Sequence, residues 1–240
     1  MQVNAIQTRV FKARENLPDF ILEHVPHVAE NTVLAVASKL FALWKGEIFP
    51  YENHTQKEAL IRRESEFALR TNLAWLTVKD GMVMTNAGID ESNADGQLLL
   101  LPKNCYRLAA QLRAELQSRW HVKNLGIVVT DSMILPLRAG VIAGAVAYAG
   151  FKGVRDQRGT PDLFGKKLKV TLINVADTLA SAAALEMGEA AERRPLAVLT
   201  QTPVEFVDSA IENEIKYPMK DDLYAPLFQA VGYNRKGDKK

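Results

Sequence analysis

The chain has few of the residues on which several common kinds of site depend. It contains one cysteine, Cys105, and four histidines in 240 residues. A single cysteine excludes an intrachain disulfide and a cysteine-based zinc site, and it is typical of proteins in a reducing compartment. His24 and His27 lie three residues apart, while His54 and His121 are isolated. The sequence therefore shows neither a histidine metal cluster nor a nucleophile triad.

An excess of charge of either sign is also missing. The chain has 30 basic and 28 acidic residues, a formal net charge of +2, and no block of basic residues in its main part. Nucleic-acid binding normally requires a basic face, so we expect no nucleic-acid partner. Only residues 234–240 are locally basic, and we expect them to form a solvated, frayed end.

Long apolar runs are absent too. The longest stretch without charge, around residues 140–151, is rich in glycine and alanine and shorter than the about 20 residues needed to cross a bilayer. Residues 1–16 carry Arg9, Lys12 and Arg14 and have no apolar segment typical of a secretory signal. We therefore expect a cytoplasmic protein with no membrane partner.

What the chain does contain is enough apolar residues for a full core. It is 48% hydrophobic and 24% charged, and no linker, repeat or low-complexity tract divides it. We therefore expect a single domain over residues 1–240, within which two subdomains are allowed but no boundary is predicted.

Alternating strand and helix patterns predict a mixed α/β fold. Asp80-Gly81 between two β-prone runs indicates a hairpin, and Asn104 precedes a stripe of leucines as a helix cap would. The predicted strands cover residues 32–38, 73–78, 82–85, 98–101, 125–130, 168–173 and 196–200, and the predicted helices cover 55–69, a segment beginning after 104, and 174–187.

Acidic residues gather at the ends of these predicted elements, in segments 90–93, 130–132 and 187–189. Mg²⁺ and Mn²⁺ prefer oxygen ligands from one or two carboxylates together with phosphates. Taken singly, each cluster is equally typical of a cap or a turn. The segment from Gly159 to Lys167 has the wrong spacing for a phosphate-binding loop, and no Ser or Thr follows its lysine.

A series of short segments follows one order along most of the chain: 38–39, 86–93, 100–102, 130–132, 138–140, 156–159, 162–165, 168–171, 176–177 and 187–189. In sequence and spacing these segments resemble the coenzyme F-420 γ-glutamyl ligase family. Pro136-Leu137-Arg138 and the segment 221–224 are most similar to the branch of folate-metabolism γ-glutamate ligases.

The resemblance implies a two-part fold in an intertwined homodimer. It also implies a ligase that joins L-glutamate to a carboxylate of a folate-like or F-420-type cofactor. In such a reaction GTP or ATP, with Mg²⁺ or Mn²⁺, converts the acceptor carboxylate to an acyl phosphate. The same chemistry on an unrelated carboxylic acid, and a non-catalytic nucleotide-binding relative, are the alternatives.

Carried over residue by residue, the resemblance assigns the site as follows. The metal ligands would be Asp90, Asp131, Ser132 and Glu189. Nucleotide contacts would come from Ser38, Lys39, Asn93, Met187, Gly188 and Glu189, and more loosely from residues 9–12.

Three further assignments are open. Lys39 would contact phosphate, and Arg138 or Arg158 would neutralise a substrate carboxylate, although a structural ion pair explains either arginine equally well.

Two departures from the family pattern concern the nucleotide pocket and the acceptor pocket. Leu43 stands where a second lysine is usual, which makes Lys45 a candidate replacement, and residues 133–138 differ from the F-420 enzymes.

Overall fold

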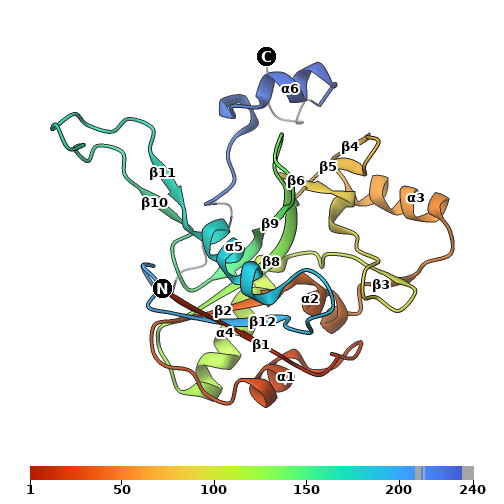
Figure 1. Cartoon of the computed structure of the whole chain (residues 1–240), viewed down its shortest axis with the longest axis horizontal. Coiled ribbons are helices and arrows are strands. Elements are labelled where there is room, and N and C mark those ends of the chain that lie inside the picture. Colours follow the sequence, from red (N-terminus) through yellow and green to blue (C-terminus); the bar gives the residue numbers. More distant parts are fainter. Residues whose placement is uncertain (209–211, 213, 234–240) are drawn as a thin grey trace.

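The computed structural model describes residues 1–208, 212 and 214–233. The basic segment 234–240, which we expected to be frayed, lies outside the described residues. A five-stranded sheet forms the centre, with strand order β1-β12-β2-β8-β9 (Figure 1). Within it β2 and β8 are parallel, whereas the other neighbours are antiparallel. The strands are β1 (Gln2–Ile6), β2 (Thr32–Ala37), β8 (Leu125–Ile134), β9 (Val141–Ala149) and β12 (Leu196–Thr200).

Helices cover both faces of this sheet (Figure 1). On one face, Leu34 and Val36 of β2 join a core with α1 (Leu17–His24), α2 (Ser38–Lys45) and α4 (Cys105–Trp120). On the other face, Val33 and Ala35 pack with α5 (Val175–Met187). Side chains of a strand alternate between faces, so a strand between two helical layers is apolar along its length, as β2 is from Val33 to Ala37. The predicted α/β class is confirmed.

A smaller β-rich region lies beside the sheet (Figure 1). In the predicted hairpin, Asp80 and Gly81 both have positive φ, 52° and 76°. Positive φ at both central residues is typical of the two-residue turn whose twist matches that of the paired strands. The hairpin is thus confirmed. The elements of this region are β3 (Ile48–Pro50), α3 (His54–Glu64), β4 (Phe67–Arg70), β5 (Trp75–Lys79), β6 (Met82–Thr85), the 3-10 turn η1 (Asn86–Gly88) and β7 (Gln97–Leu99).

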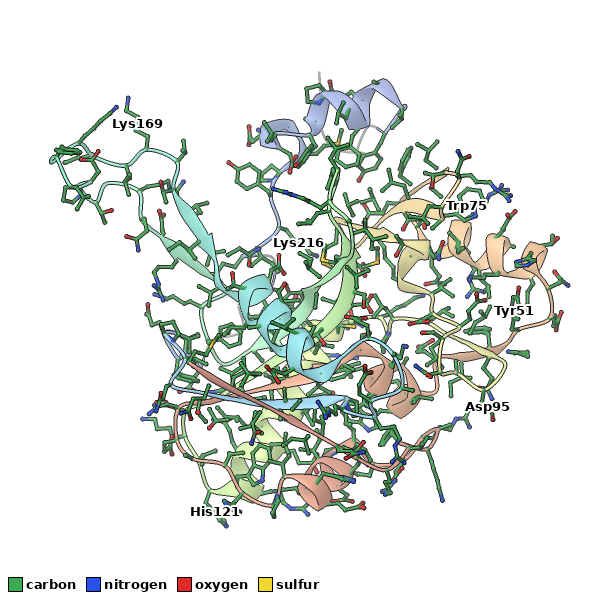
Figure 2. All side chains as sticks on the ribbon, viewed as in Figure 1. Tyr51, Trp75, Asp95, His121, Lys169 and Lys216 are labelled. Carbon is green, nitrogen blue, oxygen red and sulfur yellow. The ribbon has the colours of Figure 1, made fainter. Side chains whose placement is uncertain are left out.

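Two segments extend from this body. Strands β10 (Val154–Asp156) and β11 (Leu172–Asn174) begin an arm whose far end carries Lys169 (Figure 2). After β12 the chain continues to η2 (Met219–Asp221) and α6 (Ala225–Ala230). Beyond α6, the ring of Tyr233 lies 5.2 Å from that of Phe67, so the C-terminal segment is attached to the β4–β6 sheet.

Several predicted boundaries are wrong, because tertiary pairing decided them. The helix predicted over 55–69 ends at Glu64, since Phe67 and Ala68 pair with β5 as a strand. The strand predicted over 168–173 begins only at Leu172. Asn104 does precede α4, but its φ of 61° is left-handed and its side chain makes no cap bond. Strand β9, which overlaps the charge-free run, was not predicted. Because β8 pairs with β9, β8 extends to Ile134, beyond its predicted end at residue 130.

No helix among the residues that the structure describes is long and apolar enough to cross a membrane.

Candidate active site

The register between β2 and β8 brings the first pair of site residues together. These strands run parallel with Ala37 opposite Thr130, so the next residues, Ser38 and Asp131, are neighbours. Ser38 begins α2, and its Oγ donates a hydrogen bond of 2.9 Å to Asp131 Oδ1. Asp131 was predicted at the end of its strand, but it lies within β8, just beyond a register shift after Val129.

Lys39 connects this pair to the loop after η1. Its Nζ lies 3.0 Å from Asp90 Oδ2 and donates to Ser92 Oγ at 2.8 Å and to Ser92 O at 3.2 Å. The backbone N–H of Ser92 in turn donates to Asp90 Oδ1 at 2.6 Å. Asp90 is itself fixed by backbone bonds in both directions with Leu99. The ammonium group of Lys39, in the first turn of α2, therefore has a defined place against a loop that is more than fifty residues away in the sequence.

The end of α5 supplies the last segment. Gly188 ends the helix with a φ of 82°, and Glu189 Oε2 accepts a 2.7 Å hydrogen bond from Ser132 Oγ. Asn93 Nδ2 donates to the carbonyl of Ala190 at 2.9 Å, which joins this loop to the Asp90 loop. Met187 is buried in the core and does not offer its side chain to the site surface.

The carboxylates differ in their electrostatic surroundings. Burial raises the pKa of Asp131 to about 6; the Ser38 hydroxyl opposes the rise and the Asp90 charge adds to it. Burial would also raise the pKa of Asp90, but the Lys39 charge and hydrogen bonds from Ser92 outweigh it and lower that pKa. Two carboxylates that repel each other, with one ammonium between them, form a region where a further cation would be stabilised.

The geometry divides the predicted metal ligands into two pairs. Asp131 and Ser132 are consecutive in a strand, so their side chains point to opposite faces of the sheet. Asp131 lies with Asp90 near Lys39, whereas Ser132 lies with Glu189. Within residues 1–208, 212 and 214–233, no three His, Cys, Asp or Glu side chains are arranged to hold a metal ion. The donors are all oxygens, which suit Mg²⁺ or Mn²⁺, and such ions commonly complete their shell with substrate phosphates.

The other predicted residues lie away from these contacts. Arg158 is exposed on the arm in an ion pair with Asp156, in which Nε donates to both carboxylate oxygens and Nη2 donates to Oδ2 at 2.6 Å. Arg138 is exposed in the turn between β8 and β9. Lys45 Nζ lies 3.4 Å from the centre of the Trp44 ring, at the end of α2 opposite Ser38. Arg9 forms ion pairs with Glu15 and Glu23.

The structure also contains a cavity of about 300 Å³ close to the Lys39–Asp90 contact, and the sequence did not predict it. The lining residues of this cavity come from the β5–β6 hairpin, the segment after β7, the start of α4, β9 and the C-terminal segment. They are too scattered in the sequence for any spacing to signal them. They are Asp80, Met82, Leu101, Asn104, Cys105, Tyr106, Arg107, Val146, Glu212 and Lys216.

Comparison with known proteins identifies the family. A sequence model of the F420-0:Gamma-glutamyl ligase family matches residues 5–201. The chain belongs to this family. It is 39% identical to the coenzyme F420:L-glutamate ligase of Methanopyrus kandleri over 209 residues, covering 79% of this chain and 82% of the relative. The ligase of the same name from Methanocaldococcus jannaschii is 28% identical over 244 residues, covering 93% and 96%. Membership of this family confirms the resemblance predicted from the sequence, and it shows that the protein is a ligase.

Proposed function

We propose that the protein joins L-glutamate to a carboxylate of a folate-like or F-420-type cofactor, using GTP or ATP and a divalent cation. The single observation that carries this proposal is the connection of four segments, 38–39, 90–93, 131–132 and 189–190, by side-chain bonds. The names of the family's relatives supply glutamate and a cofactor carboxylate as the substrates to test.

The proposed reaction has two steps, because an amide does not form from a free carboxylate in water. First, the γ-phosphoryl group passes to an oxygen of the acceptor carboxylate, giving an acyl phosphate and a nucleoside diphosphate. The glutamate nitrogen then forms a bond to the acyl carbon and loses a proton, while the C–O bond to phosphate breaks and phosphate leaves. Both steps depend mainly on positioning and charge neutralisation.

The residues present fit these needs. Lys39 would neutralise phosphate oxygens from its position beside Asp90. As two separate pairs on opposite faces of β8, Asp90 with Asp131 and Ser132 with Glu189 would hold Mg²⁺ or Mn²⁺, which would supply charge neutralisation on the phosphates when bound. Asn93 and the 187–189 segment would contact the nucleotide from the loop junction that they share.

We further propose that the protein acts as a homodimer in the cytoplasm. The arm supports the dimer: Leu163 and Phe164 are 98% and 94% exposed, and apolar side chains of this size are normally covered. In a dimer, Arg138 of the hairpin turn and Arg158 of the arm could face a substrate bound to the other copy. Within one chain, Arg158 forms its ion pair with Asp156, two residues away on the same arm.

The experiment is mass spectrometry of products after incubation with L-glutamate, Mg²⁺ or Mn²⁺, ATP or GTP, and a panel of folates and F-420 precursor. We expect a product heavier by one glutamyl residue, and nucleotide cleavage that depends on the acceptor. A product from another carboxylic acid would retain the chemistry but replace the acceptor. Tight nucleotide binding without phosphate release across a broad acid panel would overturn the proposal in favour of a non-catalytic relative.

A further inference from the structure

The 300 Å³ cavity and the carboxylate site share one lining residue. Leu101 lines it and also lines a small hollow formed with Ser38, Lys39 and Asp90. Val146, another lining residue, is left unpaired where β8 shifts register, since Val129 pairs with Ala147 and Thr130 with Ala145. This shift lies between Val129 and Thr130, one residue before Asp131. A molecule in the cavity would therefore lie close to the segments that carry both carboxylates.

The cavity offers charges of both signs around an apolar wall. Arg107 and Lys216 are its cations, and Asp80 and Glu212 are its anions. The apolar wall is formed by Met82, Leu101 and Val146. The first turn of α4 also faces this space, and its backbone N–H groups favour negative charge. Such a lining suits a ligand that carries both an ammonium group and carboxylates.

The C-terminal segment completes the cavity. Figure 2 shows Lys216 where this segment passes the β8–β9 hairpin. Two residues earlier, Glu214 accepts hydrogen bonds from Tyr148 Oη at 3.0 Å and from the Gly153 N–H at 2.6 Å, which fix the segment against β9. The family match ends at residue 201, so Lys216 comes from outside the matched region.

We propose that this cavity binds the acidic α-amino acid that the ligase uses as its amine, with Lys216 and Arg107 holding its two carboxylates and Asp80 and Glu212 facing its ammonium group. This inference rests on the proposed function, and it adds the place where the amino acid binds and the residues that bind it. Size supports it, because a cavity of about 300 Å³ is at the lower limit of ligand pockets and suits a molecule of about ten non-hydrogen atoms. A folate or deazaflavin acceptor has several times as many atoms and would need a larger space.

The test measures binding and turnover separately. Calorimetry would give the dissociation constant of L-glutamate for the wild type, Lys216→Ala and Arg107→Ala, and initial rates would give KM for glutamate, nucleotide and acceptor. We expect each variant to raise the glutamate constants about tenfold or more, since a charge-assisted hydrogen bond is lost, and to leave the nucleotide KM unchanged. Lys216→Arg should restore most of the affinity. Lys220→Ala, an exposed lysine on the same segment, is the matched control and should change nothing.

The outcomes separate this inference from the proposed function. A change in the acceptor KM alone would overturn it, because the cavity would then belong to the acceptor. Amide formation with unchanged glutamate constants in both variants would also overturn it, while the proposed function stood. If no acceptor gave an amide, glutamate binding to the wild type that is lost in Lys216→Ala and kept in Lys220→Ala would still support the cavity assignment.

Discussion

The two long hairpins of this protein have similar shapes but opposite surroundings. The β8–β9 hairpin pairs from Ile127 to Ile134 and is buried in the sheet for most of its length. The β10–β11 arm pairs over three residues on each strand, with one isolated bridge further out between Pro161 and Lys167, and it exposes apolar side chains such as Leu163 and Phe164. Packing fixes Asp131 and Ser132 against segments distant in the sequence, whereas Arg158 of the arm has a partner two residues away. A side chain can be placed accurately for chemistry only where the surrounding structure holds it.

The sharpest test of that difference is Asp131→Asn, the change in the packed hairpin. It keeps the shape and the Ser38 hydrogen bond but removes the charge. We expect kcat to fall about a hundredfold or more, corresponding to roughly 3 kcal/mol of lost electrostatic stabilisation. Steady-state rates at saturating nucleotide and metal would measure it. Normal turnover in a folded variant would show that the carboxylate is only structural.

The arm is tested by a double change, Leu163→Asp with Phe164→Asp. Both side chains are almost fully exposed, so the fold of one chain should keep its melting temperature. If the arm packs on a second copy, sedimentation should show a monomer and activity should fall about tenfold, because buried charge opposes association. An unchanged oligomeric state would show that the arm is not the dimer contact. Lys169→Glu, at the tip of the arm, serves as a milder comparison.

A third prediction concerns stability in the absence of metal. Because the pKa of Asp131 is raised to about 6, the folded state holds a proton there that the unfolded state releases near its ordinary value of 3.8. Ionising this group therefore costs stability as the pH rises through that window, and the full cost is present above about pH 6. Asp131→Asn should stabilise the metal-free protein by about 1 to 3 kcal/mol at pH 7.5 and by little at pH 4. Urea unfolding at both pH values would measure this, and equal effects would contradict the burial argument.

The smallest expected effect is that of Lys45→Ala. Lys45 lies on the Trp44 ring, and burial lowers its pKa. Because it is at the far end of α2 from Ser38, we expect the nucleotide dissociation constant to change less than about threefold, whereas Lys39→Ala should weaken binding more than tenfold. Calorimetry with both variants is the comparison. A large loss in Lys45→Ala would show that it replaces the lysine missing at Leu43.

Prediction from sequence worked best where local chemistry decides the structure. The Asp80-Gly81 hairpin and helix 175–187 depend on turn residues and on the Asn174 cap, which are visible in the sequence. Prediction failed where pairing partners are distant. Strand β9 and the extension of β8 depend on each other, and Phe67 became a strand residue because β5 lies beside it.

The family, the α/β class and the set of polar residues available for chemistry follow from residue type and order along the chain, and so they can be inferred without a structure. The arrangement of those polar residues depends on how the strands pack together. The parallel register of β2 and β8 placed Ser38 beside Asp131, and strand alternation sent Ser132 to the other face, towards Glu189. Lys216 reached the cavity beside Arg107 through a C-terminal segment fixed by Glu214. Contacts between residues 57 and 93 positions apart depend on the packing of the whole sheet, and no local sequence pattern predicts them.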